Sequence, residues 1–137
     1  MQLCRKLSVA AIALAAPLAL AGPPNLAKAK AEVFYRSFDS TSFIALDAAA
    51  LARAYDRHLS LTGPRELQAL LAALPSQCIS VTPEHARDLR LLIRWSAAST
   101  WTWQASQFAY RDGRTGATCQ FSRTQQDTLL ASLALKR

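Results

Sequence analysis

The most restrictive feature of the sequence is a pair of alternating segments, residues 88–95 (DLRLLIRW) and residues 101–110 (WTWQASQFAY). Apolar side chains occupy every second position of the first segment, and tryptophans do so at the start of the second. That period of two is typical of β-strands with one buried face. Asp112-Gly113 then indicates a turn, and residues 117–121 (ATCQF) predict a last strand. We therefore expect a three-stranded antiparallel meander in this half of the chain.

The first half of the chain predicts one strand and two helices. Residues 31–38 (AEVFYRSF) are rich in aromatic and β-branched residues and predict the first strand. Asp47 is a suitable N-cap for a helix over residues 48–61, in which apolar side chains recur on one face. A second helix over residues 64–74 has proline at its first position and is stopped by Pro75.

The remaining signals complete an α+β pattern. Residues 78–81 (CISV) predict a short extended segment, and Ser122 with Gln125 matches the capping box that opens a C-terminal helix. The expected order is thus a strand, two helices, an extended segment, a meander and a helix. We predict a small antiparallel sheet, formed by the first strand and the meander, with the two central helices and the C-terminal helix packed on one face.

Residues 1–21 have the organisation of a secretory signal peptide. Arg5 and Lys6 precede an apolar run over residues 7–20, and Ala21 completes the small-residue motif that signal peptidase reads. The run is shorter than the ~20 residues that span a bilayer, which disfavours the alternative of an uncleaved anchor. We expect cleavage after Ala21, a periplasmic or secreted protein, and no stable membrane span after cleavage.

We assign residues 22–31 to a flexible lead-in and residues 32–137 to one disulfide-bonded domain. Cys4 leaves with the signal peptide, so that Cys78 and Cys119 remain. In an oxidising compartment such a pair predicts a disulfide. Closing a loop of about 40 residues stabilises a fold by roughly 3–4 kcal/mol. Free or metal-binding thiols are the less favoured interpretation, because the chain has no CxxC motif and no nearby histidine pair.

Trp101 and Trp103 raise the main question about function. In an extended segment they share one side with Ala105, whereas Thr102 and Gln104 lie on the other side. An antiparallel sheet covered on one side buries its apolar face, so we expect both rings in the core. The alternative is a stacking platform for sugars or nucleotides at the edge of the sheet, with Trp101 as the exposed ring.

The other side of the meander carries positive charge. The chain has 16 basic and 9 acidic residues, and loss of Arg5 and Lys6 with the signal leaves 14 basic residues and a formal charge of +5. Arg90 and Arg94 alternate with the apolar positions of the meander, and Arg36 of the first strand can join them. We expect a solvated, positive face that attracts anionic partners. The alternative is a face that only keeps the protein soluble.

The sequence offers little support for an enzyme. Its two histidines, His58 and His85, have no second histidine at ligand spacing, and Glu84, His85 and Asp88 form the one local cluster of acid and imidazole. Acidic residues are expected in a first helical turn without any catalytic role. The chain lacks the G-x-S-x-G, H-E-x-x-H and phosphate-loop motifs. We expect no enzyme activity, no cofactor and no metal site.

We predict an exported, basic binding protein. The alanine- and arginine-rich composition is typical of a high-GC bacterium, whose envelope offers acidic proteins, lipopolysaccharide and peptidoglycan carboxylates as anionic partners. The leading hypothesis is an inhibitor or immunity protein whose protein partner meets the arginine-bearing face or an open edge strand. The alternative is a binding module for an anionic glycan or lipid that uses Trp101 or Trp103, and a small hydrolase around His85 comes third. Export and the absence of a recognised motif argue against a nucleic-acid partner.

Overall fold

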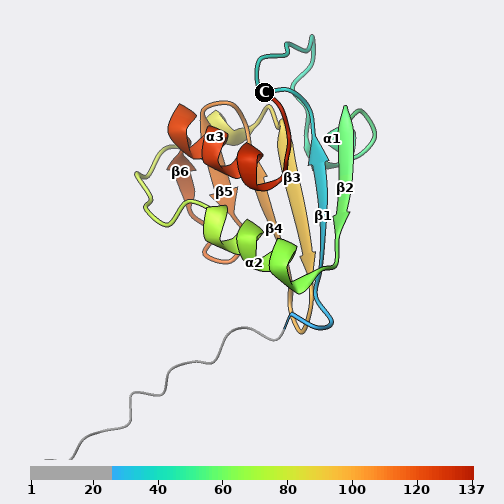
Figure 1. Cartoon of the computed structure of the whole chain (residues 1–137). Helices are drawn as coiled ribbons and strands as arrows, with labels where there is room; N and C mark the ends of the chain where they lie inside the picture. Colours follow the sequence, from blue (N-terminus) through green and yellow to red (C-terminus); the bar gives the residue numbers. More distant parts are fainter. Residues whose placement is uncertain (1–25) are drawn as a thin grey trace, which may run out of the picture.

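The computed structural model describes residues 26–137, so the expected signal peptide and Cys4 lie outside the described residues. The described chain is α+β, as predicted, with a six-stranded antiparallel sheet in the order β2-β1-β3-β4-β5-β6 (Figure 1). The strands are β1 (Lys30–Tyr35), β2 (Arg57–Leu61), β3 (Leu91–Ser96), β4 (Thr100–Ala105), β5 (Ala109–Asp112) and β6 (Thr118–Gln120). The helices are α1 (Ala48–Leu51), α2 (Pro64–Ala73) and α3 (Arg123–Ser132), with one 3₁₀ turn, η1 (Pro83–Ala86).

The two longer helices, α2 and α3, cover one side of the sheet, which we call the inner face (Figure 1). The register places Val33, Ile93 and Trp103 side by side on β1, β3 and β4, and all three side chains are fully buried. The alternation of apolar residues in β3 and β4 therefore serves the core under the helices, as the sequence indicates. The opposite side, the outer face, carries the side chains at the intervening positions.

Both long helices begin with the signals found in the sequence. Pro64 occupies the start of α2, and Leu67 and Leu70 form its buried stripe. At the start of α3 the Ser122 hydroxyl accepts the N–H of Gln125, whose side chain in turn accepts the N–H of Ser122. This capping box pairs two amide donors that would otherwise be unsatisfied at the helix end.

The helix predicted over residues 48–61 is wrong after its first turn. Asp47 caps α1 by accepting the N–H of Ala50, but α1 ends at Leu51 and the chain then forms β2. Leu59 pairs with Val33 of β1 and lies partly buried against the core of the inner face. The leucines of β2 recur at a period of two, and pairing with β1 places Leu59 and Leu61 against the core of the inner face.

The meander has four strands, β3 to β6, instead of the expected three, because residues 101–110 do not form a single strand. Ser106 ends β4, and its hydroxyl accepts the N–H groups of Phe108 and Ala109, which turns the chain into β5. A serine that bonds local backbone amides competes with the strand ladder. The turn at Gly113 is equally constrained, because a Cβ there would lie 2.2 Å from the carbonyl oxygen of Thr102.

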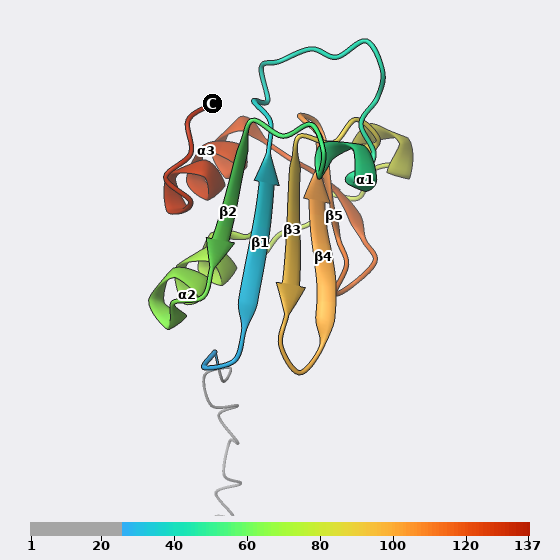
Figure 2. The same ribbon diagram turned by 90° about the vertical axis from the view of Figure 1, so that its right-hand side faces the viewer.

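The helices are not all on one face, in contrast to the prediction. Figure 2 shows α1 in front of the strands, on the side opposite α2 and α3. Leu51 of α1 packs there with Phe34, Leu89 and Leu92 in a small second cluster. The outer face is therefore partly covered at one end of the sheet and open along the rest.

The disulfide between Cys78 and Cys119 is present, as predicted. It ties the segment after α2 to β6, where Ser80 pairs with Cys119 and Ile79 accepts the N–H of Gln120. This extended segment covers the free side of β6. Within residues 26–137, β2 pairs with β1 alone and thus leaves one edge of the sheet open.

The ordered fold begins earlier than the boundary expected at residue 32. Leu26 and Ala29 are buried in the core, and β1 already starts at Lys30. The later part of the predicted lead-in, residues 26–31, therefore belongs to the packed structure. Leu26 and Ala29 lie in a short segment rich in alanine and lysine, which has no hydrophobic period that predicts their burial.

Candidate functional site

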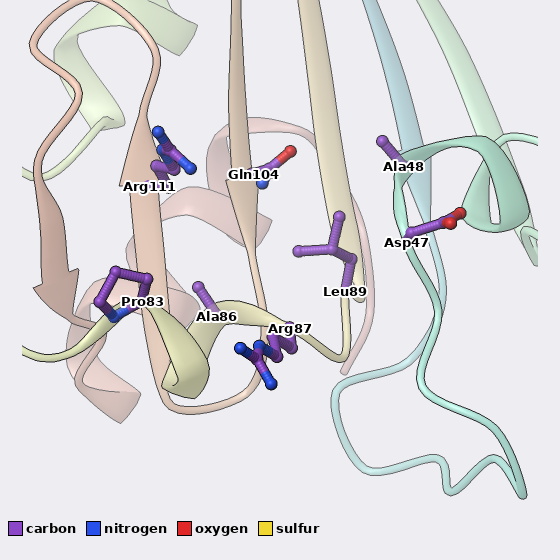
Figure 3. Close-up of a pocket in the computed structure, with 8 residues that line it drawn as sticks. All are labelled: Asp47, Ala48, Pro83, Ala86, Arg87, Leu89, Gln104 and Arg111. Carbon is purple, nitrogen blue, oxygen red and sulfur yellow. The ribbon is translucent and has the colours of Figure 1, made fainter.

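Three adjoining hollows lie along the outer face, and together we call them the outer groove. The first has a volume of about 330 Å³ and lies between α1 and η1 (Figure 3). It shares Gln104 and Arg111 with a second hollow of about 270 Å³. The second shares Thr102 and Gly113 with a third, of about 470 Å³, at the β3–β4 hairpin. Each hollow thus shares lining residues with the next, so the three lie side by side.

Sheet register brings the polar side chains of the groove together. Gln104 pairs with Leu92 of β3 on one side and with Arg111 of β5 on the other. Thr102 pairs with Arg94 one step further along the same two strands, β3 and β4. Residues paired across an antiparallel sheet project to the same face, so these side chains line one surface.

The walls of the first hollow come from outside the sheet. Figure 3 shows Pro83 and Ala86 of η1 on one side and Asp47 and Ala48 at the start of α1 on the other. Leu89 lies between them and gives the hollow an apolar floor. Arg87 and Arg111 add positive charge to the lining, and Asp47 adds a negative charge. The first hollow thus combines an apolar surface with charges of both signs.

The arginines of the outer groove are available to a partner. Arg87, Arg94 and Arg111 are exposed, and none of them forms a salt bridge with another residue of the described chain. Arg94 pairs in the sheet with Glu32, but Lys30 already binds that carboxylate at 2.9 Å. The Asp47 carboxylate accepts the N–H of Ala50 at 2.7 Å. The groove is therefore positive, with one carboxylate on its wall.

The expectation that Arg90 is exposed on this face is wrong. Its side chain is 2% exposed, and its guanidinium donates to both carboxylate oxygens of Asp88 at 2.7 and 3.0 Å. It also donates to the carbonyl oxygen of Ser40 and to the hydroxyl of Ser42. Residues 36–47 fold over Arg90, and no local pattern in the sequence predicts this long-range contact. Arg90 holds a loop in place instead of presenting a free charge.

Arg36 and Arg94 occupy different surroundings. Arg36 follows β1 and donates at 3.4 Å to the carbonyl oxygen of Ala54, near the end of α1, so it is not part of the outer groove. Arg94 is exposed on the outer face as expected, with its guanidinium 5.2 Å from the centre of the Phe34 ring. Of the three arginines singled out from the sequence, the structure brings only Arg94 into the groove.

The two tryptophans have different roles in the fold. Trp103 is fully buried, as expected, stacked 5.1 Å from Tyr110 with Phe121 at its edge. Trp101 is only partly buried, so the expectation that both rings lie in the core holds for Trp103 alone. Trp101 stacks 5.3 Å from Trp95, and the Arg114 guanidinium lies over its ring at 4.9 Å. A ligand that stacked on Trp101 would compete with these two contacts.

The structure places Glu84, His85 and Asp88 around one hollow of about 230 Å³, together with Arg90 and Ser106. The Asp88 carboxylate is occupied by Arg90 and by the N–H of Leu46 at 3.0 Å. His58 lies elsewhere, stacked at 4.5 Å on Phe34. Within residues 26–137 no three His, Cys, Asp or Glu side chains are grouped so as to hold a metal ion. In the same part of the chain, no helix has both the length and the apolar character that crossing a membrane requires.

Sequence reasoning missed Arg87 and Arg111. In β5, Arg111 is exposed between the buried residues Tyr110 and Asp112. If the turn at Ser106 had been predicted, the alternation in β5 would have placed the Arg111 side chain on the outer face. Arg87 follows the short turn η1, where neither a helical nor a strand period applies. Its place in the groove depends on tertiary packing alone.

Comparison of the chain with protein-family models, with curated proteins and with solved structures found no match.

Proposed function

We propose that the mature chain is an exported protein-binding domain whose outer groove takes an extended acidic segment of a protein partner. An inhibitor or an immunity protein of a bacterial envelope is the class that this binding fits. The observation that carries the proposal is the row of three neighbouring hollows on an open sheet face. Their lining includes three exposed arginines, Arg87, Arg94 and Arg111, that have no salt-bridge partner in residues 26–137. The disulfide supports export, because such bonds persist in oxidising compartments.

The shape of the groove favours an elongated ligand. Its three hollows follow β4 from the end near α1 to the β3–β4 hairpin. An extended polypeptide places successive side chains about 3.3 Å apart along its length. Such a segment can offer carboxylates to Arg111 and Arg94 in turn while an apolar side chain contacts Leu89.

The mixed chemistry of the first hollow favours a protein over a polyanionic glycan. A uniformly charged polymer would meet the Asp47 carboxylate and the apolar floor at Leu89 with no complementary group. A polypeptide can place an acidic side chain at Arg87 and a polar or basic one at Asp47. The ring contacts of Trp101 with Trp95 and Arg114 also weigh against a sugar platform.

Complementary charge of this kind acts mainly on the rate of association. Unpaired arginines on one face raise the local concentration of an acidic partner and orient it before contact. We therefore expect binding to weaken as salt increases, and to weaken more steeply than for a protein bound through apolar contacts.

The test compares two charge reversals of equal size. Arg87→Glu with Arg111→Glu changes the outer groove, whereas Arg65→Glu with Arg123→Glu changes exposed positions on α2 and α3, on the other side of the sheet. Each protein, from Gly22 to the C-terminus with its disulfide formed, serves as bait for envelope extracts of the organism that encodes it. A captured protein is then purified and its association rate measured on an immobilised bait.

We expect the groove variant to slow association at least about tenfold and the control variant to leave it nearly unchanged. Equal effects of both variants would contradict the groove as the binding surface. Capture of an anionic glycan or lipid with no protein would replace the proposal by the alternative of a glycan- or lipid-binding module.

A further inference from the structure

Residues 36–47, which connect β1 to α1, form a loop that rises beyond the ends of the strands (Figures 1 and 2). Two consecutive side chains of this loop, Phe43 and Ile44, have relative exposures of 110% and 78%. They are the most exposed large apolar side chains in the part of the chain that the structure describes. Neither the core nor the outer groove uses this pair, so its exposure needs a separate explanation.

The backbone around the pair is as free as its side chains. Among the described residues, the N–H groups of residues 41–45 donate no hydrogen bond, and only the Ile44 carbonyl oxygen of this run accepts one, from the Ser42 hydroxyl at 2.9 Å. Residues 40–46 include no charged side chain. A partner that covered only the two apolar side chains would bury these amides unpaired, which is costly. The loop therefore suits a partner that pairs with its backbone and also takes an apolar side chain.

Both limbs of the loop are fixed to the sheet by one ion pair. Before the exposed pair, the Arg90 guanidinium donates to the carbonyl oxygen of Ser40 at 3.2 Å and to the hydroxyl of Ser42 at 3.3 Å. After it, the N–H of Leu46 donates to the Asp88 carboxylate at 3.0 Å. Asp88 and Arg90 bind each other at 2.7 Å, so the two limbs share one anchor. The loop is thus held in place before a partner arrives, which lowers the entropy cost of binding.

We propose that residues 36–47 are the reactive loop of a peptidase inhibitor, which places Phe43 in the apolar primary pocket of a serine endopeptidase. Such a cleft supplies what the free backbone lacks, because main-chain hydrogen bonds hold an extended ligand beside pockets for its side chains. The hydrocarbon of a membrane offers no such hydrogen-bond partners. A protruding loop with a fixed backbone also matches the small backbone changes of peptidase–inhibitor complexes. The loop lies outside the outer groove, so this inference goes beyond the proposed function and does not depend on it.

The anchors give the physical reason for inhibition in place of simple cleavage. Attack of the peptidase serine hydroxyl on the Phe43 carbonyl carbon forms an ester to Phe43 and breaks the bond to Ile44, whose nitrogen takes the hydroxyl proton. In an ordinary substrate the new amine diffuses away, and water hydrolyses the ester. Here Arg90 holds the chain before the break and Asp88 holds it after the break. The amine therefore stays beside the ester and re-forms the peptide bond.

The experiment measures hydrolysis of chromogenic peptide substrates by chymotrypsin, whose primary pocket is apolar, and by trypsin, whose pocket holds an aspartate. The protein from Gly22 to the C-terminus, with its disulfide formed, is added as the inhibitor. Phe43→Ala removes the ring from the loop, and Phe43→Arg offers trypsin a guanidinium in the same place. The matched control is Phe108→Ala, which removes a ring that is 63% exposed in the turn between β4 and β5. Because these positions are exposed, we expect urea unfolding midpoints close to that of the wild type.

We expect the wild type to inhibit chymotrypsin competitively and to have little effect on trypsin. Phe43→Ala should weaken the inhibition of chymotrypsin at least about thirtyfold, as for a central contact residue, whereas Phe108→Ala should leave it unchanged. Phe43→Arg should transfer the inhibition to trypsin. Ser42→Ala removes the hydroxyl that binds Arg90 and the Ile44 carbonyl oxygen. It should therefore raise the rate at which chymotrypsin cuts the bond between Phe43 and Ile44, measured by mass spectrometry.

The proposal is overturned if the wild type does not inhibit chymotrypsin, or if Phe43→Ala and Phe108→Ala weaken the inhibition equally. Equal rates of cutting in the wild type and in Ser42→Ala would contradict the role of the anchors. Dimers in size-exclusion chromatography that Phe43→Ala abolishes would assign the exposed pair to self-association instead. Arg87→Glu with Arg111→Glu changes only the outer groove and should leave the inhibition unchanged, so the two proposals fail separately.

Discussion

Substitution of each of two neighbouring tryptophans by alanine should have clearly unequal effects on stability. Trp103 is fully buried between Tyr110 and Phe121, whereas Trp101 is partly exposed beside Trp95 and Arg114. The substitutions Trp103→Ala and Trp101→Ala are chemically identical and lie two residues apart in β4. Any difference between them therefore reports on the environment of each ring.

The magnitudes follow from burial and contacts. Removing a fully buried tryptophan leaves a large cavity, and such changes cost roughly 3–5 kcal/mol of unfolding free energy. Trp101→Ala gives up a stacked ring pair worth about 0.5–1.5 kcal/mol and a guanidinium contact worth about 0.5–1 kcal/mol. We expect roughly 1–2 kcal/mol for Trp101→Ala, well below the cost at Trp103.

The assay is equilibrium urea unfolding followed by far-ultraviolet circular dichroism, because each variant changes the tryptophan fluorescence itself. With a slope of about 1–3 kcal/mol per molar urea, Trp103→Ala should lower the midpoint by roughly 2 M and Trp101→Ala by less than about 1 M. Trp103→Phe is a useful companion, because it keeps an aromatic ring and removes an indole N–H that is buried without a hydrogen-bond partner. It should cost less than Trp103→Ala. Equal losses at the two positions, or a larger loss at Trp101, would refute the difference in burial between the two rings.

Two further predictions concern the disulfide and pH. Replacing Cys78 and Cys119 by serine should lower the unfolding free energy by roughly 3–4 kcal/mol, measured by urea unfolding, and added reductant should then affect the wild type but not the variant. Burial raises the pKa of Asp88, but a backbone N–H and the Arg90 guanidinium outweigh burial and hold the pKa below its usual value. The stability from the Asp88 carboxylate is therefore present above about pH 4 and lost as pH falls through the lower native pKa. Asp88→Asn should flatten that acid-side loss in urea midpoints, and an unchanged pH profile would contradict the role of the ion pair.

The sequence predicted those parts of the fold that local chemistry determines. Alternation identified β3 and the inner face of β4, and the Ser122 capping box identified the start of α3. The even pair of cysteines predicted the disulfide. The strands and the helix cap are each determined by residues a few positions apart. The disulfide follows from the chemistry of an oxidising compartment.

The errors occurred where long-range pairing overrode a local pattern. Leucines in residues 48–61 fit a helical period, yet Leu59 and Leu61 also fit a strand, and only β1 as a neighbour decides between them. Ser106 interrupted an otherwise regular strand through its side-chain hydrogen bonds. Both cases depend on partners that a single segment does not reveal.

The candidate site was predicted in part. Arg94, Thr102 and Gln104 face outward together because strand alternation fixes their side of the sheet. Arg90 belongs to the same alternation but is covered by a loop from residues 36–47, which no periodicity describes. The walls of the groove come from α1 and η1, so its shape depends on tertiary packing.

The most direct test of the central claim is site-specific photo-crosslinking from the outer groove. A benzophenone amino acid at Gln104 lies where two hollows meet, and the same group at Gln68, on the exposed side of α2, serves as the control. We predict that the Gln104 position crosslinks one protein partner in a defined ratio and that excess unlabelled wild type suppresses the product, with none from Gln68. Crosslinking from Gln68 and not from Gln104 would contradict the outer groove as the binding surface.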